Sequence, residues 1–274
     1  MTIGNRLRPP RLAAVQMVST PRTDENLAVA GRLVADAVAQ GALLVALPEY
    51  FPIMGMSDAD KVAAREEDGH GPVQDWLSET AARHGIWLIG GSIPLVAGDP
   101  AKMRNACVVY GPDGRRVARY DKIHLFGFTQ GAEHYDEGAT IEAGSEPVAF
   151  VTPFARVGLS ICYDLRFPEL YRRLGEPDLI VVPAAFTETT GRAHWEILLR
   201  ARAIENQCYV LAVGQGGRHE NGRETHGNSM LIDPWGSIVD RKLKGPGVVI
   251  GDFDRELIAR TRASLPALSH RIFK

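Results

Sequence analysis

Three residues of different chemical type each follow an expected strand, and together they could form the parts of a thiol-dependent hydrolase. Glu49 and Cys162 stand one or two positions beyond an apolar run, and Lys122 stands two positions beyond the expected strand at 116–120. In layered α/β proteins, reactive groups gather at the carboxyl ends of strands. A carboxylate, an ammonium and a thiol would there supply a general base, an electrostatic clamp and a nucleophile.

Each of the three residues also has a structural interpretation. Glu49 could cap a helix or face solvent, and Lys122 could be a surface lysine, because lysines are rarely buried. An isolated cysteine such as Cys162 is more often a small core residue than a reactive thiol. The polar residues Tyr163 and Asp164 weaken that interpretation, since a structural cysteine more often lies inside an apolar run. At this level both interpretations stay open.

The elements that would position these residues follow from apolar periodicity. Strands are expected at 11–17, 42–47, 86–89, 116–120, 157–161, 178–182, 208–213, 229–233, 237–240 and 248–253, and helices at 24–40, 73–84, 169–174 and 194–207. In the last helix, one face carries Ile197, Leu198, Ala201 and Ile204. Hairpins mixed with strand–helix units predict an α/β layered fold with a mixed sheet. No linker or repeat interrupts this order, so we expect a single domain spanning 1–274.

The composition excludes several classes of protein. The 274 residues include 31 Lys and Arg against 33 Asp and Glu, so the chain lacks the basic surplus of a nucleic-acid binder. No apolar stretch approaches the ~20 residues that cross a bilayer. The three cysteines are few, odd in number and widely spaced, which argues against a disulfide framework. No two histidines stand at ligand spacing with a carboxylate or thiol. We therefore expect no nucleic-acid partner, no membrane partner and no metal.

The N-terminal segment invites a second interpretation. Arg6, Arg8 and Arg11 lie before or at the start of an apolar run at 12–18, which is reminiscent of a signal peptide. That run contains Gln16 and lacks a small-residue cleavage pattern, so a first buried strand is favoured. The expected location is the cytoplasm.

Three sequence blocks resemble the signature blocks of the nitrilase superfamily. They are LPEY at 47–50, YDKIHLF at 120–126 and GLSICYDLRFPE at 158–169. They occur in the family's order and at compatible spacing, and the likeness extends from Ala13 to the last strand. The resemblance implies a four-layer α-β-β-α sandwich with mixed sheets. It also implies a homodimer or higher homo-oligomer assembled through one helix face.

The resemblance implies a role for each reactive residue. Cys162 is the nucleophile, Glu49 the general base and Lys122 the cation that stabilises the oxyanion, together with the backbone N–H of Tyr163. A cysteine thiol has a reference pKa of ~8.5, so a base must take its proton for attack at neutral pH. The substrate is a small-molecule amide, and no cofactor is required.

A second glutamate is usual in the family, about fifteen residues past the lysine and seven before a glycine. Glu137, with Gly144 after it, matches that position, and Glu133 is a less well-placed rival. Glu137 would orient Lys122 and help to balance its charge.

Two further stretches, 184–205 and 215–219, resemble the branch of the superfamily that includes deaminated glutathione amidase. That activity cleaves the amide between a 2-oxo acid and cysteinylglycine, giving 2-oxoglutarate and the dipeptide. The related ω-amidase activity instead releases ammonia from a 2-oxo acid amide. Arg166, Thr187 and His219 are candidates to bind substrate carboxylates, because cations and hydroxyls suit that task, although each could be a surface or supporting group.

One position departs from the family pattern, which often has Gly-His-Ser where this chain has Asn228 between Gly227 and Ser229. Asn228 can keep a hydrogen bond but carries no titrating proton, so we expect an effect on local structure or assembly. His124 and His194 are interpreted as structural supports. Rival hypotheses are a non-catalytic binding scaffold, which would have lost a reactive position, and a papain-like Cys–His hydrolase, whose local signatures are absent.

Overall fold

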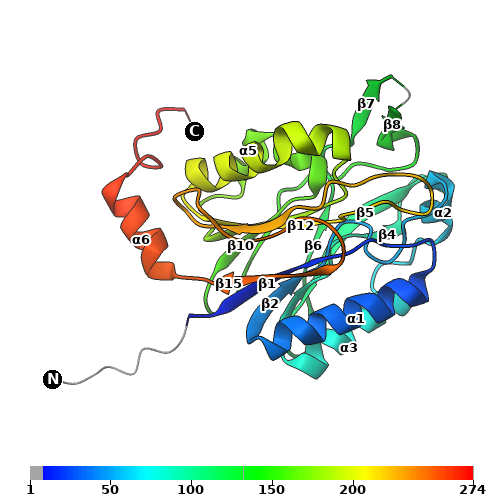
Figure 1. Ribbon diagram of the computed structural model, residues 1–274, viewed down its shortest axis with the longest axis horizontal. Coiled ribbons are helices and arrows are strands. Elements are labelled where there is room, and N and C mark those ends of the chain that lie inside the picture. The colour runs from blue at the N-terminus through cyan, green and yellow to red at the C-terminus, as the bar shows by residue number, and fades with distance from the viewer. Residues whose placement is uncertain (1–8, 132, 274) are drawn as a thin grey trace.

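Two mixed β-sheets pack face to face between layers of helices (Figure 1). The structure, a computed structural model, describes residues 9–131 and 133–273. The predicted four-layer α-β-β-α arrangement is confirmed. Arg6 and Arg8 of the N-terminal segment, and the two ends of the domain predicted at 1–274, lie outside the described residues.

The first sheet has the order β15-β1-β2-β3-β5-β4, with β6 added beside β5. β1 runs parallel to β2 and antiparallel to β15, so this sheet is mixed. The strands are β1 (Arg11–Gln16), β2 (Ala42–Ala46), β3 (Trp87–Ile89), β4 (Ile93–Val96), β5 (Met103–Tyr110), β6 (Arg116–Asp121) and β15 (Gly247–Asp252).

The second sheet has the order β14-β13-β12-β11-β10-β9 and is parallel in its centre, from β10 to β12. Its strands are β9 (Ala149–Val151), β10 (Arg156–Leu159), β11 (Leu179–Ala184), β12 (Tyr209–Gly214), β13 (Ser229–Ile232) and β14 (Ile238–Lys242). A separate hairpin, β7 (Gly127–Gln130) and β8 (Glu133–Asp136), rises beside the start of α5 in Figure 1.

The helices form the outer layers. α1 and α3 cover the first sheet and α5 covers the second, with α4 packed against α5 (Figure 1). The helices are α1 (Thr23–Ala39), α2 (Asp58–Ala63), α3 (Pro72–His84), α4 (Pro168–Arg173), α5 (Glu188–Asn206) and α6 (Arg255–Ser264), and the short 3₁₀ helices are η1 (Glu137–Ala139) and η2 (Cys162–Arg166). Within the described residues, none of these helices combines the length and apolar character that a membrane span requires.

Burial on both faces explains why the central strands are continuous apolar runs rather than alternating ones. In β1, Leu12 and Ala14 point into the core between the two sheets, whereas Ala13 and Val15 point into the core beneath α1 and α3. The reactive positions predicted at strand ends are therefore carried by the most deeply packed part of the fold.

α5 differs from the prediction in two respects. It begins at Glu188 rather than at the predicted residue 194, with Thr187 as its N-cap, because the polar first turns have no apolar periodicity to reveal them. The face that carries Ile197 and Ile204 is turned outward, with these side chains 70% and 49% exposed. The face that packs on the sheet instead carries Trp195, Leu199 and Ala203. Strands β4, β7, β8 and β9 and helices α2 and α6 were not predicted.

Candidate active site

Cys162 lies on a tight turn between β10 and the start of η2, and its backbone adopts φ +50°, in the left-handed region that side chains rarely occupy. Asp164 holds this turn from beneath, fully buried. Its carboxylate accepts hydrogen bonds from the backbone N–H of Ile161 (2.8 Å) and the Tyr120 hydroxyl (2.7 Å). It also accepts one from the backbone N–H of His124 (3.1 Å). One buried carboxylate thus ties the turn of Cys162 to the segment that carries Lys122.

Glu49 follows β2 and is 1% exposed, with each carboxylate oxygen held by donors from other segments. Oε1 accepts from Lys122 Nζ (2.8 Å) and from Asn105 Nδ2 (3.0 Å). Oε2 accepts from the backbone N–H of Ala185 (2.7 Å), directly after β11. These three bonds fix the carboxylate in one orientation.

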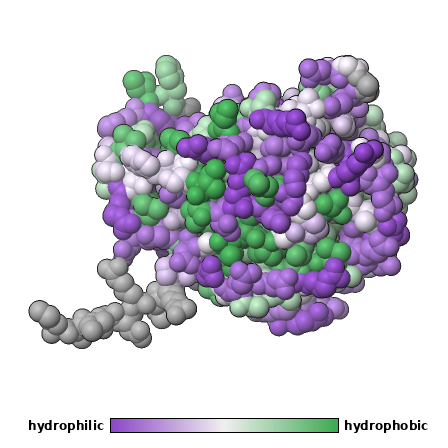
Figure 2. Space-filling model, in the orientation of Figure 1, coloured by the Kyte–Doolittle hydropathy of each residue, from purple (hydrophilic) through white to green (hydrophobic). Residues whose placement is uncertain are grey.

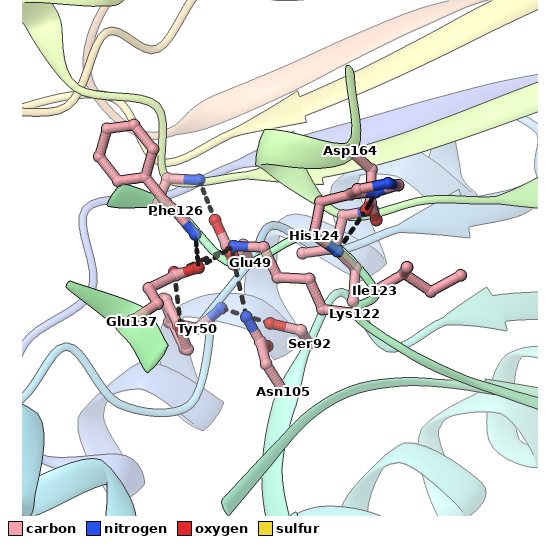
Figure 3. A network of polar contacts seen from close by, with 12 residues as sticks. Glu49, Tyr50, Ser92, Asn105, Lys122, Ile123, His124, Phe126, Glu137 and Asp164 are labelled. Atoms are coloured by element: carbon pink, nitrogen blue, oxygen red, sulfur yellow. Dashed lines mark hydrogen bonds and ion pairs between the residues drawn. The ribbon is translucent and has the colours of Figure 1, made fainter. Parts of the chain in front are cut away.

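Lys122 lies between two carboxylates and is fully buried (Figure 3). Besides its bond to Glu49, its ammonium donates to both oxygens of Glu137, at 3.0 and 2.8 Å. Glu137 is in turn held by the backbone N–H of Phe126 (2.7 Å) and the Tyr50 hydroxyl (3.2 Å). We call Glu49, Lys122 and Glu137 the charge cluster.

The charge cluster sets the protonation of the site. Burial alone would raise the pKa of Glu49 and lower that of Lys122. Lys122 outweighs burial at Glu49 and lowers the pKa of that carboxyl, and the charges of Glu137 and then Glu49 outweigh burial at Lys122 and raise the pKa of its ammonium. Burial and the charge of Glu49 raise the pKa of the Cys162 thiol well above its ordinary value. The resting site therefore holds a neutral thiol beside a carboxylate and an ammonium.

The Cys162 side chain faces a cavity of about 250 Å³. Its walls combine aromatic and polar groups, which suits a small polar ligand. They are formed by Phe126, Glu137, Cys162, Tyr163, Ala185, Phe186, Thr187, Thr190 and Arg223.

The structure brings most of the sequence-predicted residues to this cavity. Tyr163 and Thr187 line it, and the Arg166 guanidinium lies over the rings of Tyr163 and Phe186, at 5.7 and 5.3 Å from their centroids. Glu137 rather than Glu133 contacts Lys122.

The prediction for His219 is corrected. His219 is 3% exposed and does not line the cavity, and its two ring nitrogens lie 2.8 Å from the carbonyl oxygen of Ser19 and 2.9 Å from Thr225 Oγ1. Burial lowers its pKa. With both nitrogens engaged by the protein, His219 supports its own loop and has no group left for a substrate carboxylate.

The other singled-out polar residues are part of the framework. His124 Nδ1 lies 2.7 Å from Asp164 Oδ1, and the ring stacks on Phe167 with centroids 3.7 Å apart. Asn228 adopts φ +53°, which asparagine tolerates better than most residues. Its side chain bonds the His226 carbonyl and accepts from Arg241, away from the cavity.

Two site residues escaped the sequence analysis. Asn105 is fully buried in β5 and orients Glu49, and a lone amide within an apolar strand is a signal that could have revealed it, because buried polar groups need partners. Arg223 lines the cavity from a loop of mixed charge, where nothing in the local sequence indicates which side chain points inward.

Comparisons with known proteins agree with this geometry. The profile of the carbon–nitrogen hydrolase family matches residues 11–263. A deaminated glutathione amidase of Synechocystis is 42% identical, covering 97% of this chain and all of the relative. An omega-amidase of Xenopus tropicalis is 37% identical, covering 95% of this chain and 94% of the relative.

A solved structure shares the whole fold as well. Nit3 of Saccharomyces cerevisiae, described as a member of branch 10 of the nitrilase superfamily, superposes with a TM-score of 0.86 at 28% identity, covering 97% of each chain. The chain therefore belongs to the carbon–nitrogen hydrolase family, in the deaminated glutathione amidase-like branch of the nitrilase superfamily, and is a hydrolase of carbon–nitrogen bonds in amides.

Proposed function

We propose that this chain is a thiol-dependent amidase that cleaves deaminated glutathione to 2-oxoglutarate and cysteinylglycine. The observation that carries the proposal is the buried charge cluster, held by at least six hydrogen bonds, beside a thiol on a strained turn. The 42% identity to a deaminated glutathione amidase over the full length supports this choice of substrate.

In the first step, Cys162 Sγ attacks the amide carbonyl carbon while Glu49 takes the thiol proton, so that a C–S bond forms and the oxygen becomes an oxyanion. The three Lys122 N–H groups all have carboxylate acceptors at rest. Protonation of Glu49 weakens one of these bonds and frees that donor for the oxyanion. The backbone N–H of Tyr163 is the second donor, and the loss of one such donor typically costs ~10²–10³ in rate.

In the second step the C–N bond breaks, and Glu49 returns its proton to the leaving amine, which departs as the free amino group. A thioester between Cys162 and the acyl group remains. Glu49 then takes a proton from water, whose oxygen attacks the thioester carbonyl, and the proton passes to the departing Cys162 sulfur. Because Glu49 stays fixed by Asn105 and Ala185, the same carboxylate serves both half-reactions.

Product analysis with deaminated glutathione and, separately, 2-oxoglutaramate tests the proposal, with Cys162→Ala as the control. We expect 2-oxoglutarate and cysteinylglycine from the first substrate and neither product in the control. Faster ammonia release from the second substrate would favour the ω-amidase alternative, which the 37% identity to an omega-amidase keeps in view. Equal behaviour of wild type and control on both substrates would contradict the catalytic proposal itself.

We also propose that two copies of the chain pair through the outer face of α5. Apolar residues gather in patches on the face of the molecule shown in Figure 2. On α5, Ile197 and Ile204 are exposed, and Trp235 is 60% exposed in a turn whose Gly236 lies against Ile204. Light scattering should give a dimer mass for the wild type and a monomer mass for Ile197→Asp. A monomeric wild type would refute the pairing.

A further inference from the structure

One arginine lies against the aromatic rings of the cavity wall and a second lines the cavity itself, and neither has a carboxylate partner among the residues that the structure describes. The first, Arg166, lies over two aromatic rings of the cavity wall, and its Nη1 is 3.1 Å from His194 Nδ1. The second, Arg223, lines the cavity directly. A guanidinium always carries its charge, so each is a ready site for an anionic group of the substrate.

Arg223 is held in place but keeps unused donors. Its Nη2 donates to the carbonyl oxygen of Ala185 (2.9 Å), and the guanidinium lies over the Tyr135 ring, 5.2 Å from the centroid. Its Nε is buried and has no partner in the structure. A buried donor without an acceptor is uncommon in a native protein and indicates a missing partner, such as a ligand. The side chain is therefore preorganised rather than free to search.

Three of the acidic residues that line the grooves with Arg223 are engaged elsewhere. Asp58 forms an ion pair with Lys61, at 2.7 Å between Oδ1 and Nζ. Glu188 binds Arg192 at 2.7 Å and Lys244, and Glu133 accepts a hydrogen bond from the Thr189 hydroxyl. These partners neutralise or occupy the carboxylates, so the charge of Arg223 remains available to a ligand.

Arg223 also marks the point where the cavity meets two larger grooves. Of the empty space of about 250 Å³ beside Cys162, which includes open solvent, only about 10 Å³ admits a water-sized group, far below the roughly 300–1,000 Å³ of typical ligand pockets. An extended substrate would therefore continue beyond it. The corresponding volumes of the grooves are about 560 and 350 Å³, and both are lined by Glu133, Tyr135, Gly222 and Arg223. Arg166 lines neither the grooves nor the cavity itself. Arg223 is thus the arginine that a ligand extending from Cys162 into the grooves would meet.

We propose that Arg223 binds a carboxylate on the leaving-group side of the scissile amide, while Arg166 is left for a carboxylate on the acyl side. The inference rests on the proposed amidase function and deepens it. The preferred substrates are amides that carry an anionic group on each side of the scissile bond. Deaminated glutathione has this form, since its 2-oxo acid and its glycine each carry a carboxylate. An amide whose leaving group is ammonia does not engage Arg223.

Three amides and two variants test this assignment. The amides are deaminated glutathione, the same compound with its glycine carboxylate converted to a carboxamide, and 2-oxoglutaramate. The variants are Arg223→Gln and, as a matched control on the same loop, Arg218→Gln, whose side chain is exposed and lines none of the three pockets. The activity on 2-oxoglutaramate reports whether each variant is folded with a working nucleophile.

We expect Arg223→Gln to lower kcat/KM for deaminated glutathione by about tenfold to hundredfold, the usual effect of losing a charge-assisted hydrogen bond. The factor by which Arg223→Gln lowers kcat/KM for 2-oxoglutaramate should be at least about tenfold smaller than the factor for deaminated glutathione. For the wild type, kcat/KM should fall by a similar factor when the glycine carboxylate of the substrate is amidated. For Arg223→Gln, the same change of substrate should lower kcat/KM no further. Arg218→Gln should resemble the wild type on all three amides.

Equal losses on deaminated glutathione and 2-oxoglutaramate would overturn the inference, because Arg223 would then act through Ala185 and Glu49 or on the acyl side. No loss on either substrate would overturn it as well. The wild type could cleave 2-oxoglutaramate through Cys162 and yet cleave deaminated glutathione equally fast with and without its glycine carboxylate. In that case the inference fails while the amidase function stands. Absence of Cys162-dependent turnover on all three amides would refute both.

Discussion

The charge cluster and the grooves beside Arg223 are built in opposite ways. In the charge cluster, Lys122 is fully buried and Glu49 is 1% exposed, and their partners come from residues at or just beyond the ends of packed strands. The grooves are formed by the β7–β8 hairpin, the segment around α2 and the loop that carries Arg223, and their charged groups are mostly half exposed. The first region has a low dielectric and the second is open to water.

The difference separates chemistry from selectivity. A buried ammonium between two carboxylates keeps its charge without water, and in the proposed mechanism this lets Glu49 exchange protons with Cys162 in a fixed geometry. A groove formed by loops can vary in shape without disturbing that geometry. Selectivity between substrates with different leaving groups is therefore expected to depend on the groove. The same type of substitution should therefore have different consequences in the two regions.

Replacement of a lysine by methionine in each region should give the largest contrast. Lys122→Met leaves Glu49 and Glu137 buried without a counter-charge, so we expect a loss of about 3–5 kcal/mol in the free energy of unfolding. The rate should also fall by more than about 10³-fold, since base orientation and oxyanion stabilisation are lost together. Urea unfolding and kcat/KM measure the two effects.

Lys61→Met is the matched control, because Lys61 is also buried, at 6% exposure, and lies 4.3 Å from the Tyr50 ring centroid. Its partner Asp58 is largely exposed and can be solvated when the lysine is lost, so a loss of about 1 kcal/mol is expected. Similar losses of stability in the two variants would show that the two regions do not differ in dielectric as described.

The introduction of a third carboxylate into the charge cluster should change the pH dependence of the reaction. In Asn105→Asp, the new carboxylate would face Glu49 Oε1 where the amide now donates at 3.0 Å, and like charges at that distance raise the pKa of one member of the pair. In the wild type the pKa of Glu49 is lowered, so kcat/KM should stay constant down to pH values below the ordinary glutamate range. In the variant the acid limb should move upward by at least about one pH unit.

At neutral pH we expect Asn105→Asp to lose about tenfold to hundredfold in rate, because a correctly protonated general base typically contributes a rate factor of at least this size. Asn105→Ala, which removes the donor without adding charge, separates the loss of orientation from the electrostatic effect. An unchanged acid limb in Asn105→Asp would mean that Glu49 is not the group whose protonation limits the reaction.

The sequence was most informative where local pattern and burial coincide. Glu49 and Cys162 follow strands whose continuous apolar runs identify them, Lys122 follows a strand that is only partly apolar, and the fold brings the three strand ends together. The resemblance to the family, which has a glutamate about fifteen residues past the lysine, was enough to choose Glu137 over Glu133, and Glu137 is the one that contacts Lys122.

The sequence was least informative where contacts join distant, polar segments. Arg223 is positioned by the carbonyl of Ala185, 38 residues away, and its loop contains a second arginine that points outward. His219 was a candidate to bind a substrate carboxylate and lies in the stretch at 215–219 that resembles the family branch. In the structure both of its ring nitrogens bond within the protein. Ile197 and Ile204 showed helical spacing, but spacing alone does not tell an inner apolar face from an outer one.

The smallest expected effect concerns Glu188, which joins the start of α5 to the loop that carries Arg223. Its carboxylate accepts hydrogen bonds from Arg192 (2.7 Å) and His226 (3.2 Å), and from Lys244. Partial burial acts to raise the pKa of Glu188, but the bonds from Lys244 and then from Arg192 and His226 outweigh it and lower the pKa to about 2. The unfolded chain, with a glutamate pKa of 4.5, therefore binds this proton more readily than the folded chain.

The stability that Glu188 contributes is consequently complete above about pH 4.5 and is lost as the pH falls toward about 2. Glu188→Gln should unfold at a lower urea concentration than the wild type at pH 7, and the gap between their unfolding free energies should close across that window. Because the groove is open to water, the gap at pH 7 should be near the ~1 kcal/mol of a partly exposed charge pair, far below the effect of Lys122→Met. Parallel pH profiles for Glu188→Gln and the wild type would mean that the carboxylate gains nothing from its three partners, and the loop of Arg223 would then need another anchor.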